Sequence, residues 1–197
     1  MRIFIAGATG VIGIRLLPLL IADGHTVAGM TRSPEKAGLV RDAGAKPVVC
    51  DVFDATAFTM AVTEFGPDIV FHQLTDLPDE AADIAVYGER NSRIRGEGTR
   101  NLLAAATAAK VNRVIAQSIS WELPPGRGRA ATADHERAVL RAGGIVIRYG
   151  QLWGPDTYYP AEPPDPPRIH VDEAARQTVP TLQAPPGVTI VVDDRAS

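Results

Sequence analysis

The sequence predicts a doubly wound α/β fold, in which a parallel sheet carries helices on both faces of a single domain. Short apolar runs alternate with helical stretches that stop at glycine, a pattern typical of βαβ units. The runs lack in/out alternation, as expected of strands buried on both faces. A length of 197 residues suits one domain with one core.

Six apolar runs are expected to form the strands, at residues 3–6, 26–30, 47–50, 69–72, 114–117 and 145–148. The helices expected between them lie before Gly24, at 35–44, from the cap Asp54 to 66, at 90–109 and at 134–141. Residues 1–150 would thus form the sheet core.

The regular pattern weakens after Gly150, where residues 151–168 are rich in proline and unsuited to regular ladder hydrogen bonds. Asp172 is expected to cap a helix that runs to about 182, and a last strand follows at 188–192. We therefore predict that residues 151–197 form a reduced substrate lobe and C-terminal segment, packed on the core.

Composition excludes several classes of protein. The formal net charge of −3 provides no positive field for nucleic acid. No apolar run reaches the length of a membrane span. The single cysteine, Cys50, fits a reducing compartment, so a cytoplasmic location without nucleic-acid or membrane partners is expected. No metal site is expected.

The strongest chemical signal is the glycine turn after the first strand, with the sequence GATGVIG at residues 7–13. Glycines in this context allow a tight turn, close approach of a pyrophosphate, and close helix–sheet packing. The amides at the start of the helix would then face the phosphates. The residues expected to hold a dinucleotide here are Gly7, Thr9, Gly10, Val11, Ile12 and Gly13.

Residues after the next strands indicate which nucleotide is bound. An acidic residue after the second strand would favour NAD, but Arg32 stands there between Thr31 and Ser33. A guanidinium suits a 2′-phosphate, so NADP is favoured and NAD remains an alternative. Asp51 and Val52 are expected at the adenine, and Leu74 and Thr75 alongside the cofactor.

With these motifs the chain resembles the short-chain dehydrogenase/reductase superfamily, in its extended or atypical branch related to NAD-dependent epimerase/dehydratases. The resemblance rests on the glycine turn, Asp51-Val52, and residues 98–103, 114–118, 148–150, 154–155 and 169–172. It implies a Rossmann domain with a nicotinamide cofactor. It also implies nucleotide sugars or other small carbonyl compounds and alcohols as substrates, and it is compatible with a homodimer.

The resemblance fails at the family's catalytic pair, a Tyr four residues before a Lys. No such pair exists in the sequence, and the corresponding positions are Gly128 and Thr132. Ser118 and Ser120 compete for the substrate-binding serine, although one register places Ile119 there. The proton donors considered instead are Tyr149, Tyr158, Tyr159 and His135.

Other polar residues are given structural roles. His135 is expected on a helix surface, His72 as a satisfied core histidine, and His170 just before the cap Asp172. Arg90, Arg93, Arg95 and Arg100 are expected on a solvated helix face with i,i+4 ion pairs, in preference to an anion site. Arg127 and Arg129 are expected in a glycine-rich loop near the substrate, either as a lid that grips a carboxylate or phosphate or as an exposed loop.

These motifs are compatible with two functions. The first is an NADP-dependent oxidoreductase or epimerase-like enzyme that acts on a small metabolite, with Ser118, Ser120 or Tyr149 as candidate catalytic residues. The alternative keeps the scaffold without a redox step, as a lyase, isomerase or cyclase, or as a cofactor-binding regulator similar to the NmrA-like group.

Overall fold

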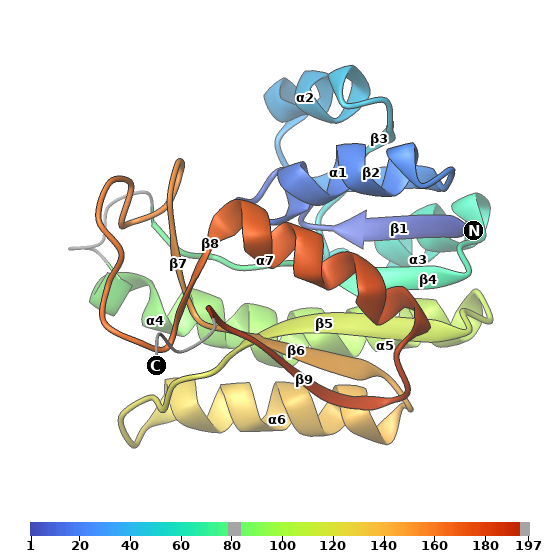
Figure 1. Ribbon diagram of the computed structural model, residues 1–197. Coiled ribbons are helices and arrows are strands. Elements are labelled where there is room, and N and C mark those ends of the chain that lie inside the picture. The colour runs from blue at the N-terminus through green and yellow to red at the C-terminus, as the bar shows by residue number, and fades with distance from the viewer. Residues whose placement is uncertain (79–83, 194–197) are drawn as a thin grey trace.

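A computed structural model describes residues 1–78 and 84–193, and its centre is a parallel sheet (Figure 1). Within those residues the sheet has seven strands in the order β3-β2-β1-β4-β5-β6-β9. Their bounds are β1 Arg2–Ala6, β2 Thr26–Thr31, β3 Lys46–Val49, β4 Ile69–His72, β5 Arg113–Ile119, β6 Ile145–Tyr149 and β9 Gly187–Val191. Every neighbouring pair is parallel, so the predicted doubly wound fold is confirmed.

Helices cover both faces of this sheet (Figure 1). The α-helices are α1 Gly13–Ala22, α2 Ala37–Asp42, α3 Ala55–Phe65, α4 Ile84–Arg93, α5 Thr99–Ala108, α6 Arg127–Arg141 and α7 Val171–Thr178. The shorter segments are the 3₁₀ turns η1 Pro34–Lys36 and η4 Val179–Gln183, and the π-helical segment η3 Ile94–Gly98. Because η3 joins α4 to α5, these three form one continuous helical run.

Alternate residues of each strand supply the two halves of the core. Ile3 and Ile5 of β1 pack in one cluster with Leu16 of α1 and Ala174 of α7. Phe4, between them, belongs to the opposite cluster, which includes Phe58 of α3 and others from α5. The strands are therefore buried on both faces, as their continuous apolar runs predict.

Three local predictions need correction. The helix expected at 134–141 begins at Arg127, so Arg127 and Arg129 lie on α6 and not in a loop. The helix expected at 90–109 begins at Ile84 and contains the π-helical segment. Finally, α7 is capped by His170, whose ring accepts the Asp172 amide, and not by Asp172. The cap Asp54 is confirmed, since its carboxylate accepts the Ala57 amide at 3.0 Å.

The segment after Gly150 packs against the same core. A short parallel pair, β7 (Gln151–Trp153) and β8 (Arg168–His170), flanks the proline-rich loop. Arg15 of α1 connects this region to the core through ion pairs to Asp156 and Asp172, at 2.9 and 2.7 Å. Strand β9 then extends the main sheet beside β6. Residues 151–193 thus complete the sheet and also carry the proline-rich loop.

None of the helices in the described ranges is both long enough and apolar enough to cross a bilayer.

Candidate functional site

The glycine turn between β1 and α1 has no room for side chains. Gly7 has a φ of +91°, and a Cβ there would lie 2.5 Å from the carbonyl oxygen of Gln73. A Cβ on Gly13 would lie 2.3 Å from the carbonyl oxygen of Gly7. Gly7 thus lets the turn pack directly on the residues that follow β4, and Gly13 lets the start of α1 pack against the turn itself.

The same turn presents unused backbone donors. Gly10 donates its amide to the Gly7 carbonyl, and Ile14 donates to Gly10. By contrast, the amides of Thr9, Val11 and Ile12 have no acceptor among the described residues. They cluster just before the ten-residue helix α1, where the helix dipole favours negative charge. The turn therefore fits the pyrophosphate of a dinucleotide.

Charged groups gather where β2 ends. Arg32 follows β2 and forms an ion pair with Asp76 at 3.0 Å, and Arg90 of α4 contacts the same carboxylate at 3.1 Å. Asp76 is buried, and its desolvation acts to raise the pKa of its carboxyl group. The hydrogen bonds and charges of Arg32 and Arg90 together outweigh this effect and lower that pKa. The Asp76 hydrogen bond also raises the pKa of Arg32, with Asp51 adding a weaker electrostatic contribution. Two guanidinium groups thus share one buried carboxylate.

The residues assigned to the adenine and to the cofactor's flank lie at the carboxyl edge of the sheet. Asp51 is exposed and accepts the Phe53 amide at 2.9 Å. Val52 is buried, and its carbonyl accepts from the Asn101 amide. The Leu74 carbonyl accepts from Gln117, whereas Thr75 is exposed. These residues follow β3 and β4, at the same edge of the parallel sheet as the glycine turn that follows β1.

Ser118 is tied into a buried network. Its hydroxyl donates to Glu136 of α6 at 2.6 Å, and Arg148 of β6 holds the same carboxylate with two hydrogen bonds. The Arg148 and Ser118 hydrogen bonds overcome desolvation and lower the pKa of Glu136. This geometry leaves the Ser118 hydroxyl without a free proton to donate to substrate.

Ser120 has the opposite character. Its hydroxyl oxygen is buried and has no hydrogen-bond partner within the described chain. It lines a cavity of about 350 Å³ together with Trp121, Arg129 and Thr132. A buried hydroxyl without a partner is costly unless a ligand or water satisfies it. Of the two serines, Ser120 is therefore the one whose hydroxyl has no partner among the described residues.

Tyr149 and the other tyrosines are engaged elsewhere. The Tyr149 hydroxyl hydrogen-bonds Thr178 at 2.5 Å inside the α7 face of the core, and burial raises the pKa of Tyr149 to about 12. Tyr158 donates to the Pro78 carbonyl at 2.5 Å, and Tyr159 contacts Gln151. At Gly128 and Thr132, the Thr132 hydroxyl donates to the Gly128 carbonyl within α6.

A buried histidine array lies between the sheet and the helices. The prediction that His135 lies on a helix surface is wrong. Its side chain is buried and only 2% exposed. Its Nε2 donates to the Gln117 carbonyl at 3.0 Å, so its Nδ1 accepts from the Thr99 hydroxyl at 2.7 Å. Thr99 in turn accepts from His72 Nε2 at 3.1 Å, which leaves His72 Nδ1 buried without a partner in the described residues.

Desolvation keeps both rings neutral. Burial lowers the pKa of His135 to about 4, with a further contribution from the nearby Arg95 charge. Burial also lowers the pKa of His72 well below its ordinary value. One signal for the array is visible in the sequence, the isolated His72 at the end of a buried strand, but nothing there pairs it with His135.

Comparison with known proteins places this site in a family. The sequence profile of the NAD(P)H-binding family matches residues 7–140, from the glycine turn to the end of α6. The chain belongs to this NAD(P)H-binding family, and its fold is that of the epimerase-type short-chain dehydrogenases/reductases.

Two curated relatives are reductases. A 3-diazoavenalumate denitrifying reductase of a Streptomyces species is 37% identical over 182 residues, covering 81% of this chain and 59% of the relative. A 4-hydroxy-2-methyl-3-oxo-4-farnesyl-3,4-dihydroquinoline-1-oxide ketoreductase of Stigmatella aurantiaca is 30% identical, covering 79% and 52%. The chain thus spans between half and three fifths of the length of these relatives.

Solved structures confirm the fold. The UDP-glucose 4-epimerase of Thermus thermophilus, solved in complex with NAD, matches 98% of this chain and 78% of its own with a TM-score of 0.78, at 20% sequence identity.

Proposed function

We propose that this protein is an NADPH-dependent reductase of a small carbonyl or similarly unsaturated metabolite. The observation that carries the proposal is the glycine turn, where three amides lack acceptors in the described chain and no side chain fits between the turn and Gln73. The reductase relatives support a redox step. The bound nicotinamide would supply hydride, and the protein would hold the substrate oxygen and deliver a proton.

The preference for NADP rests on charge at the end of β2. Arg32 and Arg90 bring two positive charges against the single Asp76 carboxylate, and the Arg32 side chain is 52% exposed. A 2′-phosphate next to Arg32 would gain a charge-assisted, bidentate interaction. A bare 2′-hydroxyl would gain much less, and no carboxylate occupies the Arg32 position to accept from it.

Replacement of Arg32 tests this preference. We expect Arg32→Ala to weaken NADPH binding about tenfold or more, because charged hydrogen bonds contribute about 1.5–3 kcal/mol, and to leave NADH binding unchanged. Fluorescence titration of both reduced cofactors measures the two affinities. The matched control is Arg41→Ala, an exposed arginine on α2. Equal loss of NADPH and NADH affinity would contradict the assignment.

Ser120 is the side chain we assign to the substrate oxygen. Its hydroxyl lacks a partner among the described residues, and it lines the cavity at the end of β5. Ser118 cannot donate while its proton is held by Glu136. We also propose that the partner of the site is a small molecule and that its substrate contacts come from the β5–α6 connection.

Turnover of a carbonyl panel tests the reductase assignment. Oxidation of NADPH, followed by absorbance, is expected with at least one aldehyde, ketone or quinoid substrate. Ser120→Ala should lower kcat/KM about tenfold to a hundredfold, the range for loss of one hydrogen bond to developing charge. Thr107→Ala, which removes an exposed hydroxyl from α5, is the matched control.

The absence of a Tyr-x-x-x-Lys pair favours two alternatives on the same scaffold, a non-redox enzyme and a cofactor-binding regulator. The same assay separates them. Binding of both oxidised and reduced cofactor, with no hydride transfer to any compound of the panel, would contradict the reductase assignment and support the regulator. Conversion of a substrate without added cofactor would support the non-redox enzyme.

A further inference from the structure

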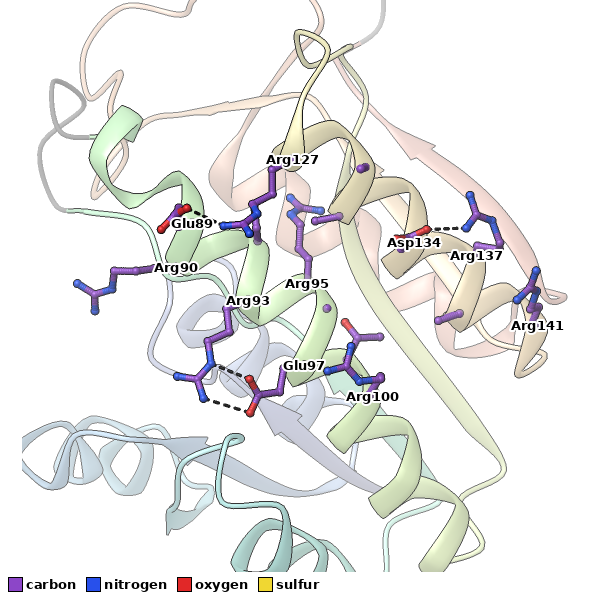
Figure 2. A pocket seen from close by; sticks show the side chains of 16 residues that line it. Glu89, Arg90, Arg93, Arg95, Glu97, Arg100, Arg127, Asp134, Arg137 and Arg141 are labelled. Carbon is purple, nitrogen blue, oxygen red and sulfur yellow. Dashed lines mark hydrogen bonds and ion pairs between the residues drawn. The ribbon is translucent and has the colours of Figure 1, made fainter.

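A groove rich in arginine lies between the α4–η3–α5 run and α6, and no residue of the glycine turn lines it (Figure 2). It has a volume of about 900 Å³, and its lining includes seven arginines but only three carboxylates. Four of the arginines have ion-pair partners, namely Arg90, Arg93, Arg127 and Arg137. Arg95, Arg100 and Arg141 have none within the described chain, so the groove carries excess positive charge.

Arg95 is the unusual member of this set. The other six arginines of the groove are exposed, but Arg95 is only 8% exposed, and its Nη1 has no hydrogen-bond partner in the described residues. Burial lowers the pKa of its guanidinium, and Glu136 offsets this only in part. A buried guanidinium with an unused donor is expensive, so it needs an anion or ordered water.

Arg95 lies in the π-helical segment, on the buried face of the helical run. Ile94, Arg95 and Gly98 of η3 are all buried. Figure 2 shows the Arg95 side chain lying between η3 and α6. π-Helical segments of this kind occur often at functional sites.

We propose that this groove binds a phosphate-bearing anion, with Arg95 at its floor and Arg100 and Arg141 at its rim. Guanidinium groups match phosphate oxygens in a bidentate geometry, and several of them around one groove suit a ligand with more than one phosphate. The site is separate from the glycine turn, because it opens between α4–η3–α5 and α6. It extends the function of the protein beyond the bound cofactor.

Inorganic pyrophosphate is the probe for this site, measured by isothermal titration calorimetry at matched ionic strength. All variants carry Gly10→Val, whose side chain blocks the pyrophosphate position of the glycine turn. We expect Arg95→Met to lower pyrophosphate affinity at least about tenfold. Arg41→Met, which removes one charge from exposed α2, should leave it unchanged.

A second variant keeps the test decisive if Arg95→Met fails to fold. The double change Arg100→Gln and Arg141→Gln removes only exposed rim charges and should also weaken pyrophosphate binding. If Arg95→Met folds, its melting temperature without pyrophosphate should equal or exceed that of the parent, since a buried unpaired charge is gone. No binding by the parent, or equal binding by the parent and the charge-deletion variants, would overturn the proposal.

Discussion

At the scale of single residues, the histidine array makes the stability of the fold depend on pH. His135 donates to one carbonyl and accepts from Thr99, and this arrangement requires a neutral ring. Its pKa of about 4 lies below the ordinary value of 6.5. Between these values the unfolded chain binds a proton that the folded chain does not, so the free energy of unfolding falls as the pH falls.

We expect His135 alone to remove about 3 kcal/mol of stability between pH 6.5 and pH 4, with His72 acting in the same direction. Urea unfolding at a series of pH values measures this slope. His135→Gln should flatten it, whereas His25→Gln, outside the array, should not. An unchanged slope in His135→Gln would show that the array is not what titrates.

Single residues also show the limit of sequence reading at the site. Arg32 and the glycines of the turn can be identified from the sequence, because their position after a strand defines what they contact. Ser118 and Ser120 look equivalent in the sequence. In the structure, Ser118 donates its proton to Glu136 of α6, whereas the Ser120 hydroxyl has no partner in the described chain. Such long-range pairings leave no local pattern to read.

At the scale of elements, strands were more predictable than helices. The seven parallel strands lie close to the predicted apolar runs, because burial on both faces demands continuous apolar sequence. The start of α6 was missed because Gly126-Arg127-Gly128-Arg129 has the composition of a loop, yet it forms the first turn of the helix. Packing of the helix against β5 and β6 outweighs the low helix propensity of glycine there.

The π-helical segment is another element-scale feature that periodicity hides. Of the two i,i+4 ion pairs expected on this face, Arg93–Glu97 forms at 2.7 Å, whereas Glu89 pairs with Arg127 and not with Arg93. Arg95, which lies in the π-helical segment, is buried and departs from the predicted solvated face. The interpretation of the four arginines as one surface set was therefore correct for Arg90, Arg93 and Arg100 and wrong for Arg95.

At the scale of the whole molecule, nearly all of the described chain either forms the strands of the main parallel sheet or packs against that sheet. The proline-rich loop is anchored to α1 by Arg15 and reaches the segment after β4 through Tyr158, so it lies against the elements that carry the cofactor residues. Strand β9, which pairs with β6, shows that the C-terminal segment completes the core. The substrate groups proposed above therefore belong to the sheet edge and the β5–α6 connection.

The central claim is that the glycine turn binds a nicotinamide dinucleotide. A Cβ at Gly10 would lie 3.4 Å from the Gly7 carbonyl oxygen, so the backbone there has room for a Cβ. We expect the rest of a valine side chain to occupy the space where a phosphate would meet the turn's amides, which have no acceptor among the described residues.

The most direct measurement is a fluorescence titration of NADPH into the parent protein and Gly10→Val, with both shown to be folded by circular dichroism. The account predicts saturable binding by the parent and a loss of affinity of about a hundredfold or more in the variant, because several charged hydrogen bonds are removed together. Equal binding by the two proteins, or no binding by the folded parent, would contradict it.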